Sequence, residues 1–164
     1  KQKTAYEISL GLVGSEMCIR DRIYTIGHSN RSLDQFLRLL RLYGIDAVID
    51  VRRFPTSRKV PHFKRERLEE ALRKAGVKYY WLGDLLGGFR PGGYETYMAT
   101  EGFAEGLRRL LEIVDSHERP AIMCRERLWF RCHRRFISDE LVKLGYEVIH
   151  IIEAGETRVH RARR

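Results

Sequence analysis

The sequence predicts one α/β domain: a three-layer sandwich built on a five-stranded, mainly parallel sheet of the Rossmann or flavodoxin type. Three observations support this prediction. Short β-rich runs alternate with amphipathic helical stretches, which is the pattern of βαβ units joined by parallel crossovers. Residues 45–51 are almost continuously apolar, as expected of a strand covered on both faces. The 164 residues, 43% of them hydrophobic, suffice for one domain with its own core and are too few for two domains of ordinary size.

Boundary residues place the elements in order. Ser32 and Gln35 form a capping box at the start of the first helix, and Thr100 is a good N-cap for a later one. Glycines stop three helices, at Gly44, Gly76 and Gly145. The expected strands are residues 23–27, 45–51, 77–82, 120–124 and 146–152. The expected helices are residues 33–43, 64–75 and 101–114, and a last one from Arg131 or Cys132 to Leu144.

The two ends of the chain differ from the middle. Residues 12–22, LVGSEMCIRDR, resemble the translation of a transposase adaptor used in preparing sequencing libraries. We therefore expect residues 1–22 to be a non-native leader and residues 23–164 to be the domain. Residues 153–164 form a basic tail, and we expect its last part, Arg158–Arg164, to be a disordered, solvated end.

Composition limits the function classes. No apolar run approaches the roughly 20 residues that cross a bilayer, so a soluble protein with no membrane partner is expected. Three cysteines and no signal peptide predict free thiols in the cytoplasm rather than a disulfide framework. The net charge of +9 makes a polyanion such as nucleic acid one candidate partner. Alternation of Arg with Glu over residues 65–70 favours an ordinary solvated helix face instead.

Polar side chains gather at the ends of the predicted strands, whereas turns and helix stops precede the strands. Ligands of open parallel sheets bind at the carboxyl ends of strands, so a binding or catalytic site is predicted at this edge. The candidate residues that follow the first three strands are His28, Ser29, Asn30, Asp50, Arg52, Ser57, Gly87, Gly88 and Tyr94. Those that follow the fourth are Cys124, Glu126, Cys132, His133 and Arg134, and His150 ends the fifth.

These same segments resemble the domain-of-unknown-function 488 family of bacteria and archaea. The matching residues are Thr25–Asn30, Asp50–Arg52 with Pro55 and Ser57, Leu86–Gly88, Tyr97-Met98, Met123-Cys124-x-Glu126 and Cys132–Arg134. The resemblance implies the α/β fold and a shared site but no particular reaction. Leu128–Phe130 stand where relatives typically carry a proline, so the loop between the two cysteines is expected to differ in shape.

Cys132 is the sharpest candidate for chemistry. We expect it in the first turn of a helix, where free backbone N–H groups and the helix dipole favour a thiolate. Cys124 is then a resolving thiol or simply a buried hydrophobic residue. A zinc site from Cys124, Cys132, His133 and His28 has suitable ligand types but unusual spacing. The block between the cysteines lacks the spacing and the glycine of a phosphatase-like anion loop, so that interpretation is rejected.

The remaining candidates divide into acid–base and anion-binding groups. Glu126 and His28 are the candidate acid–base pair, and His28 could instead fix its loop by hydrogen bonding. Asp50 and Arg52 point to the same side of their strand, so they form either a salt bridge or part of a ligand site. Arg52 and Arg134 are the candidate anion ligands, because a guanidinium binds oxyanions in a bidentate manner.

The leading hypothesis is an enzyme, or an enzyme-derived binding domain, that holds a nucleotide-like or phosphorylated anion at the carboxyl edge of the sheet. A nucleic-acid-binding module without catalysis is the alternative, and a purely structural partner protein is a third interpretation. The sequence predicts no metal site, names no cofactor or reaction, and leaves the oligomeric state open.

Overall fold

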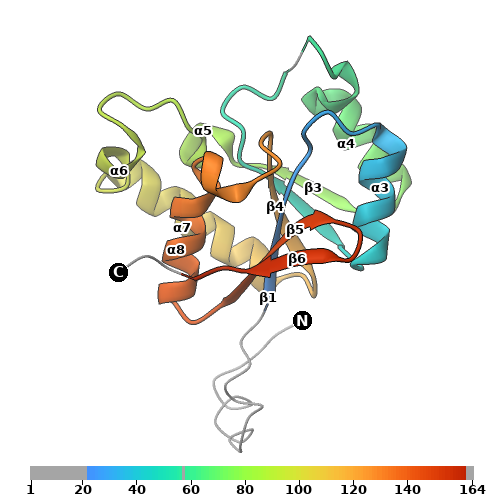
Figure 1. Cartoon of the computed structure of the whole chain (residues 1–164). Helices are drawn as coiled ribbons and strands as arrows, with labels where there is room; N and C mark the ends of the chain where they lie inside the picture. The colour runs from blue at the N-terminus through green and yellow to red at the C-terminus, as the bar shows by residue number, and fades with distance from the viewer. Residues whose placement is uncertain (1–21, 57, 162–164) are drawn as a thin grey trace, which may run out of the picture.

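The computed structural model describes residues 22–56 and 58–161, and within them the strands form one six-stranded sheet (Figure 1). The strand order is β3-β2-β4-β1-β5-β6. The strands are β1 (Arg22–Gly27), β2 (Ala47–Asp50), β3 (Lys78–Trp81), β4 (Pro120–Cys124), β5 (Glu147–Glu153) and β6 (Glu156–Val159). Strands β1 to β5 pair in parallel, and β6 runs antiparallel to β5. The predicted leader, residues 1–22, lies outside the described residues except for Arg22, which begins β1.

Helices cover both faces of the sheet, as Figure 1 shows, so the predicted three-layer arrangement is present. The α-helices are α3 (Leu33–Leu42), α4 (Arg65–Lys74), α5 (Gly83–Leu86), α6 (Tyr94–Tyr97), α7 (Glu101–Asp115) and α8 (Arg134–Lys143). Two short 3₁₀ helices, η1 (Pro61–Phe63) and η2 (Trp129–Arg131), lie in the loops that follow β2 and β4. None of the helices in the described ranges is long and apolar enough to cross a membrane.

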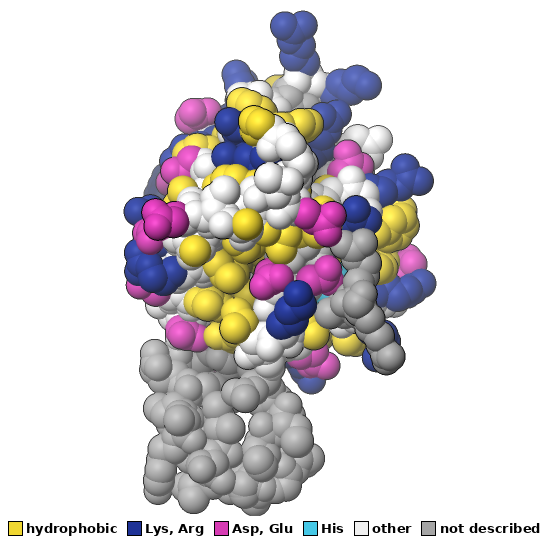
Figure 2. Space-filling view, turned by 90° about the vertical axis from the view of Figure 1, so that its left-hand side faces the viewer, with side chains coloured by type: hydrophobic (Ala, Val, Ile, Leu, Met, Phe, Trp, Pro, Cys, Tyr) yellow, Lys and Arg dark blue, Asp and Glu magenta, His cyan; other side chains and the backbone are white. Residues whose placement is uncertain are grey.

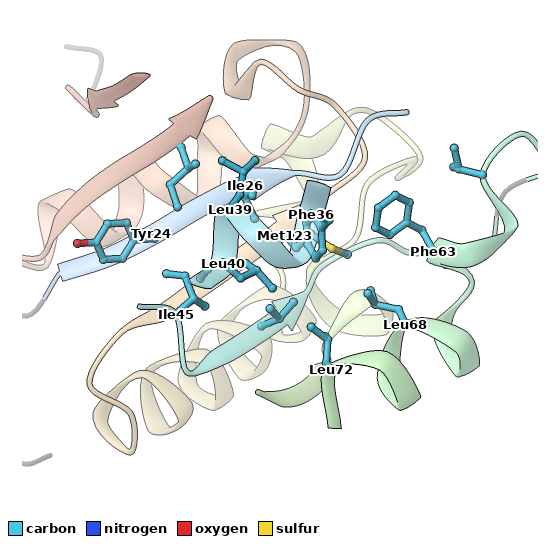
Figure 3. Packing of buried hydrophobic residues seen from close by; sticks show 14 residues of the cluster. Tyr24, Ile26, Phe36, Leu39, Leu40, Ile45, Phe63, Leu68, Leu72 and Met123 are labelled. Atoms are coloured by element: carbon cyan, nitrogen blue, oxygen red, sulfur yellow. The ribbon is translucent and has the colours of Figure 1, made fainter. Parts of the chain in front are cut away.

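Each face of the sheet has its own apolar core. Side chains of α3 and α4 such as Phe36 and Leu68 pack on one face against strand residues such as Ile26 and Met123 (Figure 3). The other face packs against α5, α7 and α8 through a second cluster that includes Cys124. Because both faces are covered, the central strands β2 and β4 are fully buried and read as continuous apolar runs.

The predicted helix caps are confirmed. The Ser32 hydroxyl accepts from the backbone N–H of Gln35, and the Gln35 side chain accepts from the N–H of Ser32, which completes the capping box. The Thr100 hydroxyl accepts from the N–H of Phe103 at the start of α7. These local bonds satisfy N–H groups that have no partner within the helix.

A sixth strand corrects two predictions. Five strands were expected, with residues 153–164 as a basic tail that is disordered from Arg158 on, but β6 pairs with β5 through residues such as Thr157 and Arg158. The hairpin turns at Ala154 and Gly155, and Gly155 has a φ of +76°, which a residue without a side chain adopts easily. The tail is therefore ordered as far as the description reaches, residue 161.

The strand order places a crevice at one edge of the sheet. It differs from the 3-2-1-4-5-6 order of Rossmann folds and the 2-1-3-4-5 order of flavodoxin-like folds, so the likeness to them is one of architecture only. Strands β1 and β4 are neighbours, yet β1 continues into α3 on one face and β4 into α8 on the other. Their carboxyl ends thus form a topological switch point, which is where such sheets bind ligands.

Candidate functional site

A cavity of about 590 Å³ opens at the carboxyl ends of β1, β2 and β4. The predicted site residues that line it are His28, Arg52, Gly88, Tyr94, Cys124, Glu126, Cys132 and His133. It is also lined by residues that were not named as site residues: Arg53, Phe54, Thr56, Phe89, Arg125, Arg131 and Phe136. The structure therefore brings residues from five separate segments of the chain together at the predicted edge.

The two cysteines form a close pair in this cavity. Cys124 is buried at the end of β4, and its Sγ lies 3.0 Å from the Sγ of Cys132. The expectation that Cys132 lies in the first turn of a helix is wrong, because α8 begins at Arg134 and Cys132 directly follows η2. The first N–H of α8, that of Arg134, nevertheless donates to Cys132 Sγ at 3.3 Å, so the helix start still reaches the thiol.

The two thiols titrate differently. The hydrogen bond from Cys124, together with the nearby Arg134 guanidinium, lowers the pKa of Cys132 to about 5. Burial raises the pKa of Cys124 well above its usual value. The shared proton therefore resides on Cys124, and Cys132 is a thiolate at neutral pH. A thiolate, unlike a thiol, is a strong nucleophile.

Arg134 explains why a thiolate is stable at this position. Its side chain is fully buried, and its guanidinium donates to Thr25 Oγ1 at 3.0 Å and to the carbonyl oxygen of Glu126 at 2.6 Å. Within the described ranges no carboxylate forms an ion pair with Arg134, although burying a lone charge is costly. The Cys132 and Cys124 sulfurs raise the pKa of Arg134 against the effect of burial. The thiolate is thus the counter-charge of this arginine.

Arg52 has a different counter-charge. Its Nε and Nη2 donate to the two carboxylate oxygens of Asp50 at 2.9 and 2.7 Å, and Tyr79 Oη donates to the same carboxylate at 2.7 Å. Arg52 Nη1 also lies 3.2 Å from His28 Nε2. Asp50 therefore lies beneath Arg52 as its buried partner and does not line the cavity.

His28 is held in one neutral form. Because Arg52 can only donate, His28 Nε2 accepts from it, and Nδ1 carries the proton and donates to the carbonyl oxygen of Ser29 at 2.8 Å. Burial and the Arg52 charge lower the pKa of His28 to about 3. Both ring nitrogens are engaged, so this geometry favours a positioning role for His28 over acid–base catalysis. The Glu126 side chain lines the cavity and is exposed, and it keeps the acid–base role open.

Two glycines and a tyrosine support the wall of the cavity. A Cβ on Gly87 would lie 2.4 Å from the Gly83 carbonyl oxygen, so Gly87 serves close backbone packing and does not line the cavity. A Cβ on Gly88 would lie 3.1 Å from His133 Nδ1. Tyr94 donates to the carbonyl oxygen of Leu86 at 2.7 Å, and burial raises its pKa.

Of the remaining candidates, Ser29 and Asn30 lie outside the lining, whereas His133 lines the cavity. Ser29, at a φ of +51°, and Asn30 form the turn after β1, with a 3.4 Å hydrogen bond between their side chains. Ser57 falls outside the described residues. His133 donates from Nε2 to the carbonyl oxygen of Val51 at 2.9 Å. Among the described residues no three His, Cys, Asp or Glu side chains are placed to hold a metal ion, so the zinc alternative gains no support.

The sequence analysis did not name two arginines of the cavity, Arg125 and Arg131, as site residues. Arg125 and Arg131 are exposed at the cavity, and no carboxylate in the described ranges pairs with either. Figure 2 shows Lys and Arg side chains at the top of this face, where the carboxyl edge of the sheet lies in Figure 1, and also along both of its sides. Arg125 and Arg131 could have been identified from their neighbours in the sequence, because Arg125 directly follows Cys124 and Arg131 directly precedes Cys132.

The loop that carries these arginines has the unusual sequence noted above. Leu128 directly precedes η2, and Trp129 and Phe130 are its first two residues. The Trp129 ring stacks on His150 with centroids 4.4 Å apart and planes within 6°. A Cβ on Gly27 would lie 1.7 Å from the Glu126 carbonyl oxygen, so only glycine lets β1 pass this close to the loop. The loop is thus fixed at both of its ends against the sheet.

Comparison with known proteins identifies the family. No curated protein and no solved structure matches the chain significantly. The family described as domain of unknown function DUF488 matches residues 32–141, which is more than half of the chain and contains Arg52, Cys124, Glu126, Cys132 and Arg134. The chain therefore belongs to the DUF488 family.

Proposed function

We propose that this DUF488 protein is an enzyme that binds an anionic substrate at the carboxyl edge of its sheet and attacks it with the Cys132 thiolate. The observation that carries the proposal is the fully buried Arg134, which lies beside Cys132 and has no carboxylate partner in the described part of the chain. A structural thiol needs no such charge, whereas a nucleophile is stabilised by it as a thiolate.

The cavity residues divide into roles. Arg125 and Arg131 line the cavity, and no carboxylate of residues 22–56 or 58–161 forms an ion pair with either, so they are the candidate ligands of the anion; Arg53 lines the same cavity. Arg52 and Arg134, the arginines first expected to bind the anion, instead hold buried internal charges. Glu126 is the candidate acid–base group, and Cys124 keeps a proton 3.0 Å from the nucleophile. A site of this kind needs a reducing compartment such as the cytoplasm.

The alternative of a nucleic-acid-binding module receives less support. Its electrostatic attraction would need free cations over a broad surface. Three arginines on α4 and α7 are instead paired with glutamates one turn away, for example Arg73 with Glu70 at 2.7 Å and Arg109 with Glu105 at 3.0 Å. This arrangement is typical of a solvated helix face.

The test is the alkylation of Cys132 by iodoacetamide, followed residue by residue with mass spectrometry on the full chain. We expect Cys132 to react at pH 7 as a thiolate, with a pH midpoint well below the ~8.5 of a free thiol, while Cys124 stays protected until unfolding. Millimolar phosphate should slow the reaction, and R131A with R125A should abolish this protection. R73A, on the exposed face of α4, is the matched control.

Two results would count against the proposal. A Cys132 thiol that is inert in the folded protein would make the pair structural. Protection by phosphate that survives the loss of both Arg125 and Arg131 would remove the anion from this cavity. Steep, salt-sensitive binding of nucleic acid that is indifferent to these arginines and to Cys132 would favour the binding module.

A further inference from the structure

Two phenylalanines at the cavity are exposed far beyond what is usual for this side chain. Phe54 is 61% exposed and Phe89 is 83% exposed, and both line the cavity. Their ring centroids lie 6.0 Å apart with the planes tilted by 41°. They come from different segments, the loop after β2 and the loop after α5. A single exposed apolar residue needs no explanation, but two converging rings at a cavity indicate a contact surface for a ligand.

The backbone of Phe89 is strained in order to present its ring. It has a φ of +60°, a left-handed conformation that residues with a side chain avoid. Gly88, which could adopt this conformation easily, directly precedes it, yet the left-handed position falls on Phe89. Such conformations persist where the surrounding structure enforces them, and they cluster at ligand-binding sites. Here Arg53 Nη1 donates to the Phe89 carbonyl oxygen at 2.5 Å and ties the loop to the end of β2.

Arg53 also joins the two rings to the positive part of the cavity. Its guanidinium carbon lies 5.4 Å from the centre of the Phe54 ring, within the range of a cation–π contact. Arg125 and Arg131 line the same cavity. An aromatic lip and a set of cations therefore meet in one space of about 590 Å³, which falls within the roughly 300–1,000 Å³ of small-molecule sites.

We propose that the cavity binds a nucleotide, with the base stacked on Phe54 and Phe89 and the phosphate held by Arg125 and Arg131. This assignment of a substrate class rests on the proposed function of the same site. Planar bases stack well on aromatic side chains, and guanidinium groups bind phosphate in a bidentate manner. The mixed lining requires a ligand with both parts. A sugar phosphate would leave the rings bare, and an apolar molecule would leave the arginines unpaired.

The experiment compares the parts of the ligand by isothermal titration calorimetry on the full chain. The probes are AMP, ribose 5-phosphate, adenosine and a 5′-phosphorylated pentanucleotide. We expect AMP to bind at least tenfold more tightly than either ribose 5-phosphate or adenosine. The F54A/F89A double variant should lose the preference for AMP over ribose 5-phosphate and keep its affinity for ribose 5-phosphate. F130A, which removes an exposed ring outside the cavity lining, should leave both affinities unchanged.

The outcomes separate this inference from the proposed function. Equal affinities for AMP and ribose 5-phosphate would overturn the base-stacking site and leave the anion site standing. A preference for AMP that survives in F54A/F89A would do the same. Failure of every phosphorylated probe to bind would overturn both proposals. Tighter binding of the pentanucleotide than of AMP would support the nucleotide chemistry and identify its source as a nucleic acid end rather than a free nucleotide.

Discussion

At the scale of single residues, the site depends on how two buried arginines are neutralised. Arg52 is paired with the Asp50 carboxylate, whereas among the described residues the charge of Arg134 is offset by the sulfurs of Cys124 and Cys132. A buried charge left without a partner destabilises a fold by several kcal/mol, so removal of one partner forces the other to change its state. If Arg134 is removed, the Cys132 thiolate can respond by binding a proton near neutral pH, whereas a carboxylate such as that of an aspartate binds a proton only in acid. The Arg134–Cys132 pair is therefore one in which protonation and stability are coupled.

The first prediction concerns this coupling. R134M removes the charge and keeps a similarly long side chain, so the pKa of Cys132 should rise by at least two units toward that of an ordinary thiol. R134K should give an intermediate value. The measurement is the pH dependence of Cys132 alkylation in each variant. R135M, the neighbouring arginine on α8, is the control and should leave the midpoint unchanged.

If the pH midpoint of Cys132 alkylation is the same in R134M as in the parent, Cys124 alone sets the acidity of the Cys132 thiol. In that case C124S would be expected to move the midpoint instead, because the hydrogen bond from Cys124 is the larger influence on this pKa.

The sequence located many of the residues that line the cavity but not their protonation states. It placed Cys132, His28 and Glu126 near one another because each follows a parallel strand. It could not separate neutralised arginines from free ones. For Arg52, the sequence left open whether it binds an anion or forms a salt bridge with Asp50. The side-chain geometry decides this, because both Asp50 carboxylate oxygens accept from the Arg52 guanidinium.

At the scale of elements, a chain of buried polar groups links β1, β5, β6 and α8. Arg134 donates to Thr25 Oγ1, which contacts His150 Nδ1 at 2.5 Å. His150 Nε2 lies 2.8 Å from His160 Nδ1, and His160 Nε2 lies 2.6 Å from the Asp139 carboxylate. An arginine can only donate and a carboxylate can only accept, so with neutral rings every bond in the chain points from Arg134 to Asp139. The end of β6 is thereby fixed to the core.

The second prediction tests this chain at His160. H160F fills the space but removes the hydrogen bonds that His160 forms with His150 and with Asp139, and a buried hydrogen bond lost in this way costs about 1–3 kcal/mol. We expect the free energy of unfolding to fall by about 3 kcal/mol in urea titrations. V159F, at the exposed last residue of β6 next to His160, should change it by less than about 0.5 kcal/mol. A similarly small change in H160F would mean that the polar chain contributes little to stability.

Element prediction succeeded where local chemistry decides and failed where pairing decides. The capping box at Ser32 and the apolar run of β4 carry their own signals. Residues 156–159, ETRV, have the composition of a solvated tail, and only pairing with β5 and the burial of His160 make them a strand. The start of α8 moved past Cys132 because η2 uses residues 129–131 first.

At the scale of the whole molecule, the switch point gathers the site. The carboxyl edge was predictable without the strand order, because the carboxyl ends of parallel strands always share one edge. The strand order was not predictable. Strands β1 and β4 are separated by almost a hundred residues, and both faces of each strand are covered, so their residue pattern carries no register signal. This topology buries His28 and His150 and partly buries Cys132, so we expect the stability of the fold to depend on pH.

The last prediction is that the fold loses stability in acid, starting near neutral pH. Burial lowers the pKa of His28 to about 3 and that of His150 to about 2, and Cys132 titrates near 5. Each group binds its proton more weakly in the folded chain than in the unfolded chain, so each stabilises the fold at high pH. The histidine contributions decline as the pH falls below ~6.5, and the Cys132 contribution declines between its ordinary value and about 5.

The free energy of unfolding should therefore decrease from pH 8 to pH 5, by up to about 1.4 kcal/mol per pH unit for each group. Urea titrations at fixed ionic strength measure this slope. H28Q keeps a polar side chain that does not titrate, so its slope below pH 6.5 should be shallower than that of the parent by as much as one proton's worth. A stability that is constant over this range, or an H28Q slope equal to the parent's, would mean that His28 is protonated in the folded state and that Arg52 does not occupy its Nε2 atom in solution.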